Sequence, residues 1–220
     1  MVYFLFTCFF SSFTVHAQVA VSKEPRHHLI FENDKVRVLN VEVPPGDTTQ
    51  YHVHSTPSVF IPFTNTYTGS QRINERPEYN TSVAGNVWYE DLSEPHIKVH
   101  RVWNLDTSVF HVMDIELLAN NKNFVLNPQP IAHTHLLIDT PWARVYSVQL
   151  EKNEIINFTD QPSDFILISI DTAEIKLIAN QEESIAFIRP GQYYWINAGD
   201  KFSVINRRDV LAKFILVSLR

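Results

Sequence analysis

The chain has 220 residues, of which 45% are hydrophobic and 19% charged, and its formal net charge is −6. That length and balance predict a globular chain of one large or two small domains. The sequence holds no basic stripe that could neutralise phosphate groups. This argues against a nucleic-acid partner and against a role on an anionic membrane surface.

The first 17 residues differ in kind from the rest of the chain. They contain no Lys, Arg, Asp or Glu, and their apolar run is shorter than the ~20 residues that a membrane-spanning helix needs. Small residues at Val15 and Ala17, before Gln18, fit a cleavage site. We therefore expect a signal peptide over residues 1–17 and an exported protein, periplasmic or secreted, with no membrane contact after cleavage. A short N-terminal anchor is the alternative.

Cysteine chemistry is not expected in the mature chain. The single cysteine, Cys8, lies inside the expected signal peptide. Neither a disulfide nor a thiol nucleophile is then available, and the cysteine count does not indicate a redox compartment.

After the signal peptide the sequence has the pattern of β-strands. Residues 35–43 alternate between apolar and polar with period two, and residues 173–178 do so in part. Residues 165–168 form a short continuous apolar run, which is typical of a strand buried on both faces. Turn residues at 44–47 and 190–191 separate such runs. We predict an all-β fold.

An internal repeat divides the chain into two parts. Residues 28–41 align without a gap with residues 135–148, an offset of 107 positions, and His, Leu, Arg and two Val recur at matching places. Residues 100–104 align in the same way with residues 202–206 near the end of each part. Two tandem copies of one β unit, each of about 100 residues, explain both matches.

Two motifs in the first copy identify a family that it resembles. Gly46 is followed, after five residues, by His52-Val53-His54, and a second segment runs from Pro95 through His100 to Asn104. These spacings resemble the two cupin motifs, Gly-x5-His-x-His-x3-4-Glu and Pro-x-Gly-x-x-His-x-x-x-Asn. The resemblance implies two tandem cupin-type (jelly-roll) β-barrels: residues 18–124 with a metal site and residues 125–220 without one.

The resemblance implies that His52, His54 and His100 bind one metal ion per chain. Side chains at i and i+2 of a strand point to the same face, so His52 and His54 would both enter the barrel. Three imidazoles suit Fe(II), Mn, Ni, Cu or Zn and leave coordination positions open. The family's glutamate is missing, because Ser58 and Val59 stand at its position. A metal-free pocket of hydrogen-bonded histidines is the alternative.

Other polar residues are interpreted more conservatively. Glu90 and His96 lie in a loop that is longer than the family pattern, and we expect them to be exposed. Their alternative role is a fourth ligand or a proton-transfer group. Four further histidines are interpreted as structural: His27, His28, His133 and His135.

The second copy lacks the ligands. The gap-free alignment places Thr159 and Gln161 opposite His52 and His54, and the closing match places Phe202 opposite His100. We expect this barrel to be packed with side chains and to serve a structural or dimer-forming role.

Two classes of function follow. One is a metal-dependent enzyme, a dioxygenase or isomerase that acts on a small organic substrate held beside the metal. The other is a non-catalytic exported protein whose barrel binds a small ligand. Fold alone does not choose between them, and it does not identify the substrate.

Overall fold

The computed structural model describes residues 18–120 and 130–220, so the expected signal peptide, Cys8 and the expected boundary at residue 124 lie outside it. Within the described ranges the chain forms nineteen strands and one 3₁₀ helix, Val21–Lys23. The prediction of an all-β fold is confirmed. No helix in this part of the chain is long and apolar enough to cross a membrane.

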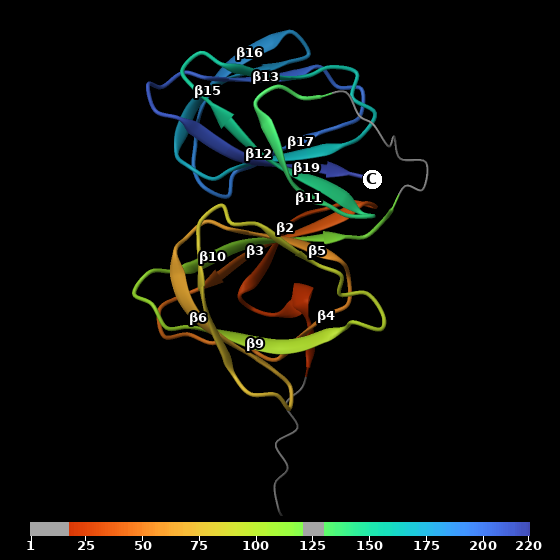
Figure 1. Cartoon of the computed structure of the whole chain (residues 1–220), viewed down its shortest axis with the longest axis vertical. Coiled ribbons are helices and arrows are strands. Elements are labelled where there is room, and N and C mark those ends of the chain that lie inside the picture. The colour runs from red at the N-terminus through yellow and green to blue at the C-terminus, as the bar shows by residue number, and fades with distance from the viewer. Residues whose placement is uncertain (1–17, 121–129) are drawn as a thin grey trace, which may run out of the picture.

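Ten strands form the first barrel, in the lower half of Figure 1. They are β1 (Val19–Ala20), β2 (His27–Glu32), β3 (Val36–Val43), β4 (His52–His54), β5 (Ser58–Pro62), β6 (Thr66–Arg72), β7 (Glu78–Ser82), β8 (Trp88–Glu90), β9 (Lys98–Asn104) and β10 (Phe110–Leu117). They pair into two sheets, β1-β4-β9-β6-β7 and β2-β3-β10-β5-β8.

Nine strands form the second barrel, in the upper half of Figure 1. They are β11 (Thr134–Asp139), β12 (Ala143–Leu150), β13 (Ile155–Phe158), β14 (Phe165–Ser169), β15 (Ala173–Ala179), β16 (Glu182–Ile188), β17 (Tyr193–Ile196), β18 (Phe202–Asn206) and β19 (Ala212–Leu219). The sheets are β11-β12-β19-β14-β17 and β13-β18-β15-β16. The strand order of the first barrel therefore recurs, apart from β1, which has no counterpart among residues 130–220.

The structure bears out the repeat in detail. The register of β2 on β3 shifts between Leu29 and Phe31, and the register of β11 on β12 shifts between Leu136 and Ile138, at the equivalent place. The two copies also close their last hairpins in the same way. In each, a buried asparagine at the end of β9 or β18 donates its side-chain amide to two backbone carbonyls.

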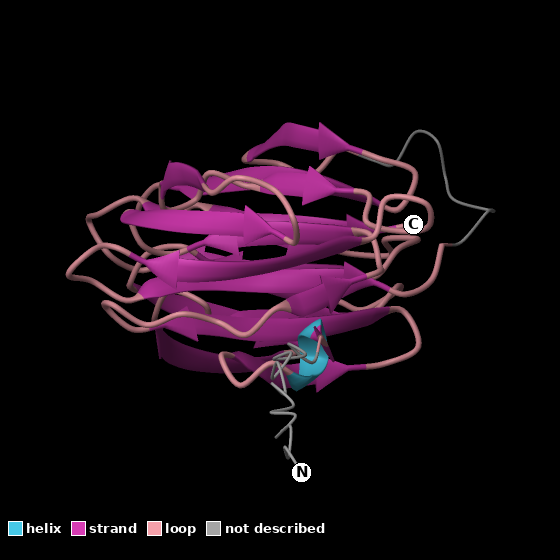
Figure 2. Cartoon of the chain, turned by 90° about the horizontal axis from the view of Figure 1, so that it is seen from below, coloured by secondary structure: helices cyan, strands magenta, loops and turns pink. Residues whose placement is uncertain are grey.

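A shared apolar layer joins the two barrels. The sheets that contain β3 and β12 face each other, and their strands are stacked in layers in Figure 2. On β14, Ile166 and Ile168 enter this layer, whereas Phe165 and Leu167 face the interior of the second barrel. Burial on both faces explains the continuous apolar run that the sequence shows there.

The core of the second barrel is packed with apolar side chains, as expected. Strand pairing, however, corrects the alignment of the ligand positions. His52 pairs with His100 across β4 and β9, and the equivalent pair across β13 and β18 is Phe158 with Phe202. Phe158, not Thr159, therefore occupies the place of His52. The gap-free alignment was wrong by one residue at this strand, because the loop that precedes it differs in length.

The asparagine that closes the second copy gives a test of the fold. Asn206 is fully buried and donates to the carbonyls of Leu150 and Val210, both at 2.8 Å. Asn206→Ala leaves these acceptors without partners, so we expect the free energy of unfolding to fall by about 2–3 kcal/mol. Urea unfolding measures this. Asn157→Ala, at an exposed site on β13, is the matched control and should change it by less than about 0.5 kcal/mol.

Candidate metal centre

The structure brings the three predicted histidines together inside the first barrel. His52 and His54 point inward from β4 and are 1% and 2% exposed, and His100 on β9 is 8% exposed. The ring centroid of His100 lies 4.6 Å from that of His52 and 5.1 Å from that of His54. That these residues bind a metal stays a prediction, but their convergence is a structural fact.

A fourth histidine joins them. His27, at the start of β2, is buried, and its ring centroid lies 4.6 Å from that of His52. One ligand nitrogen from each of His27, His52 and His54 lies within 4.8 Å of the other two. The sequence pattern predicts a structural role for His27, and the structure instead places it among the candidate ligands. We call His27, His52, His54 and His100 the histidine cluster.

Polar contacts at Nδ1 hold three of the four rings, those of His27, His52 and His100. His52 donates from Nδ1 to the backbone carbonyl of Gln50 at 2.9 Å, and its buried Nε2 has no hydrogen-bond partner in the described chain. His100 Nδ1 lies 3.1 Å from the hydroxyl of Ser70. The Nε2 atoms of His54 and His100 are 3.1 Å apart. Two lone pairs at that distance repel each other unless a proton or a cation lies beside them.

Burial favours the neutral form of three of these imidazoles. It lowers the pKa of His52 to about 4, and the interaction with the neighbouring His27 adds to this effect. Burial also places the pKa of His54 and of His100 well below the ordinary value, and the neighbouring histidines lower it further. Neutral imidazole is the form that binds a metal. His52, His54 and His100 therefore offer unprotonated nitrogens near neutral pH.

A buried carboxyl group stands behind the cluster. Asp114 on β10 is 1% exposed, and its Oδ2 lies 3.6 Å from Nδ1 of His54, slightly beyond hydrogen-bonding distance. Neither oxygen has a hydrogen-bond partner of normal geometry among the described residues. Burial raises the pKa of Asp114 well above its ordinary value, and the charge of Glu116 adds to this. A divalent cation in the cluster would favour its ionised form.

The residues present therefore fit a divalent metal. Inward-facing imidazole nitrogens and an unpartnered buried carboxyl group are the donors and the outer-shell acceptor that such a site uses. The family's glutamate has no replacement at its own position, since Ser58 and Val59 are buried on β5.

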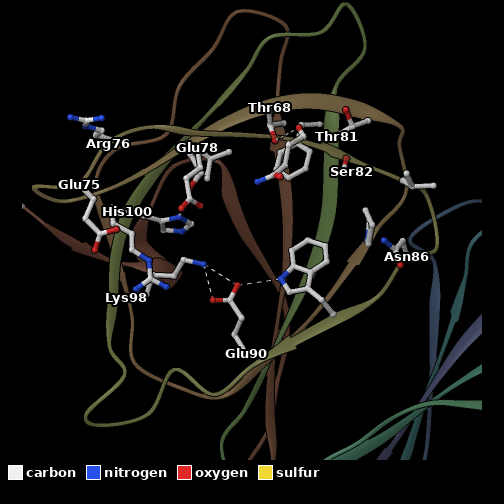
Figure 3. Close-up of a pocket in the computed structure, with 18 residues that line it drawn as sticks. Thr68, Glu75, Arg76, Glu78, Thr81, Ser82, Asn86, Glu90, Lys98 and His100 are labelled. Carbon is white, nitrogen blue, oxygen red and sulfur yellow. Dashed lines mark hydrogen bonds and ion pairs between the residues drawn. The ribbon is translucent and has the colours of Figure 1, made fainter.

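Two adjoining cavities lie beside the cluster. An inner cavity of about 80 Å³ is lined by all four histidines and Asp114. It adjoins a cleft of about 470 Å³ at the mouth of the barrel (Figure 3). Six residues line both: Trp88, Glu90, Lys98, His100, Val102 and Phe110. We call the larger space the mouth cleft.

Glu90 and His96 lie in different environments. Glu90 lies on β8, and its carboxylate accepts two hydrogen bonds from Lys98 Nζ, at 2.9 and 2.8 Å, and one from the indole of Trp88 at 3.3 Å (Figure 3). It is thus held at the junction of the two cavities. His96 is exposed and lines neither of them.

The remaining histidines of the sequence analysis lie away from the cluster. His28 and His135 are exposed on β2 and β11, and His133 faces Glu154 at 3.4 Å. None lines the inner cavity.

Comparison with solved structures identifies the fold of the chain. No protein-family model matches the sequence, and no curated protein matches it significantly. Solved structures do match. A cupin 2 conserved barrel domain protein from Leptotrichia buccalis aligns with a TM-score of 0.58 and 12% identity, over 88% of each chain. Salicylate 1,2-dioxygenase from Pseudaminobacter salicylatoxidans aligns with a TM-score of 0.64 and 8% identity, over 90% of this chain and 77% of that one.

A third match, AerE from Microcystis aeruginosa, has a TM-score of 0.53 and 10% identity over 90% of this chain and 98% of that one. At such identities the likeness shows the fold alone. The chain has the cupin fold in its tandem, two-barrel form. Together with the histidine cluster, this fold supports a metal-binding cupin.

The buried carboxyl group gives a test of the centre. In chelator-treated protein we expect Asp114→Asn to be at least as stable as the wild type. Because its folded pKa is raised, this carboxyl group destabilises the fold only above its unfolded pKa of about 3.9. The gain should therefore be largest near neutral pH and vanish below about pH 4. Urea unfolding between pH 4 and 7 measures it.

The same substitution should weaken metal binding by about 10–100-fold, because the Asp114 carboxylate faces Nδ1 of His54 at 3.6 Å and its charge would stabilise a cation in the cluster. Competition with a chelator measures this loss. A substitution that destabilised the metal-free protein and left metal affinity unchanged would contradict the role assigned to the carboxyl group.

Proposed function

We propose that the first barrel holds one divalent transition metal through the histidine cluster and that the chain is a metal-dependent dioxygenase acting on a small organic substrate. One observation carries the proposal. Buried imidazoles converge on an inner cavity that adjoins a cleft large enough for such a substrate. The three residues predicted from sequence, His52, His54 and His100, form the centre of that arrangement.

The ligand set suits chemistry with dioxygen. Four imidazole ligands would leave two of six coordination positions open on a metal such as Fe(II) or Mn. Bound there, the metal would supply a Lewis acid and a redox-active centre for reaction between substrate and dioxygen. The chain's own residues hold the ligands, exclude water and orient the substrate.

The mouth cleft has the size and chemistry of a small-molecule site. Its volume of about 470 Å³ falls in the range of ligand pockets. Trp88, Phe110 and Val102 give it an apolar wall, and the indole of Trp88 is stacked on Phe60 at 5.1 Å, which fixes its orientation. The ion pair of Lys98 with Glu90 adds polar groups beside the histidines.

The comparisons support this choice only at the level of fold. Structures of salicylate 1,2-dioxygenase named as adducts with gentisate share the two-barrel arrangement. Gentisate and salicylate are therefore reasonable first probes, together with diketones, thiols and flavonols.

Metal stoichiometry tests the proposal first. Protein purified without chelator should bind one equivalent of Fe, Mn, Ni, Cu or Zn per chain, measured by elemental analysis. His52→Phe copies Phe158 of the second barrel and should weaken binding by at least about 100-fold. His135→Ala, on the exposed part of β11, is the control and should bind as the wild type does. Two equivalents per chain would contradict a silent second barrel.

Oxygen consumption then separates an enzyme from a binding protein. The Fe(II)-loaded protein should consume dioxygen with at least one substrate of the panel, and His52→Phe should not. A metal-loaded chain that binds panel compounds without consuming dioxygen would instead be a small-ligand-binding cupin.

Export is part of the proposal. Its support is the uncharged apolar segment before Gln18, and the first strand of the fold begins directly afterwards, at Val19. Expression of the full sequence in a bacterial host should yield mature protein that starts at Gln18 and lies outside the cytoplasm. Mass spectrometry of the intact chain from each cell fraction checks this. A full-length cytoplasmic product would contradict it.

A further inference from the structure

The segment from Gln18 to His27 is fastened along the strand that carries two candidate ligands. We call this segment the N-terminal strap. Its strand β1 pairs in parallel with β4, with Val19 opposite His52 and Ala20 opposite Val53. Val21 is 2% exposed and packs into the apolar cluster behind the site. The strap then ends in His27, itself a member of the histidine cluster.

One buried carboxylate organises the strap. The side chain of Glu24 is 1% exposed, yet both of its oxygens are occupied. Oε2 accepts hydrogen bonds from the backbone amide of Arg26 at 2.6 Å and from Nδ1 of His27 at 2.7 Å, and Oε1 accepts one from the amide of Gln50 at 3.1 Å. Burial alone would raise the pKa of Glu24, but these donors lower it below its ordinary value. The carboxylate is therefore ionised.

These contacts orient two ligands at once. Because Glu24 accepts the proton of His27 Nδ1, Nε2 of His27 keeps a free lone pair for the cluster. Glu24 acts on the second ligand, His52, through Gln50. Gln50 donates its amide to Glu24 and accepts from Nδ1 of His52 with its carbonyl. The charge of Glu24 thus polarises the residue that holds His52.

We propose that Glu24 is a positioning residue of the metal centre: it fixes His27 as a fourth ligand and, through Gln50, orients His52. Docking of the N-terminal strap and metal binding are then coupled. This inference rests on the proposed metal site, and it adds a ligand and an anchor outside the two cupin motifs.

Replacement by the isosteric amide tests the assignment. In Glu24→Gln, one acceptor oxygen becomes a donor amide, which faces either a backbone N–H or Nδ1 of His27. We expect Co(II) and Zn(II) affinity, measured by chelator competition on the full chain, to fall about 10–100-fold. The visible spectrum of the Co(II) protein should change as well, because the ligand field changes.

Asp47→Asn is the matched control. Asp47 accepts a hydrogen bond from Nε of Arg26 at 2.7 Å, so it also fastens the strap, but it contacts no histidine of the cluster. Its substitution should leave Co(II) affinity within about two-fold and the spectrum unchanged, because Glu24 keeps its three donors. An equal loss in both variants would show a merely structural role for Glu24 and overturn the proposal.

His27→Ala supplies the second variant, which keeps the test valid if Glu24→Gln does not fold. It should lose affinity to a similar extent, and the losses in the double variant should be less than multiplicative, because Glu24 acts partly through His27. Metal should also slow tryptic cleavage after Lys23, which is exposed in the strap, in the wild type but not in His27→Ala.

The outcomes separate this inference from the proposed function. Wild-type affinity and spectrum in His27→Ala would overturn the inference and leave a three-histidine centre intact. Failure of the wild-type chain to bind any metal would overturn the centre itself, and the inference with it.

Discussion

The site depends on one constraint: four imidazole rings share a small interior from which water is largely excluded. In that space a protonated ring has no solvent to stabilise it, and each additional positive charge repels the next. Burial therefore favours the neutral form of His52, His54 and His100. Gln50, Ser70 and Glu24 hold Nδ1 of His52, His100 and His27 from three different segments. All four rings line the same inner cavity.

The second barrel shows what the same architecture becomes when this constraint is removed. Its strands repeat the order and register of the first, but Phe158 and Phe202 meet where His52 and His100 do. Apolar rings need no partners and fill the volume, so this barrel becomes a packed core. Its sheet β11-β12-β19-β14-β17 packs against the sheet β2-β3-β10-β5-β8 of the first barrel through the shared apolar layer. The second copy thus supports the sheet that carries Asp114.

Much of this could be predicted from sequence, and what failed has physical causes. Period-two alternation and the repeat were sufficient for an all-β chain of two units. The resemblance to the cupin motifs supplied the barrel form and the set of His52, His54 and His100, of which the first two share a strand face because they lie at i and i+2. His27 was missed because it reaches the cluster through the fold of the strap, which no spacing encodes. Its counterpart at the offset of 107 residues is Thr134, a difference between the copies that could have drawn attention to it.

The missing glutamate ligand then has an explanation in terms of charge. A glutamate in the coordination shell would reduce the charge of a divalent centre directly, whereas histidines leave it at 2+ inside a low-dielectric interior, which is costly. Two buried carboxyl groups lie one residue further out, Glu24 behind His27 and Asp114 behind His54. Together they can balance the ion without occupying a coordination position. In the proposed centre, His27 would take the coordination position of the family's glutamate, and the negative charge would lie behind the ligands instead of on the metal.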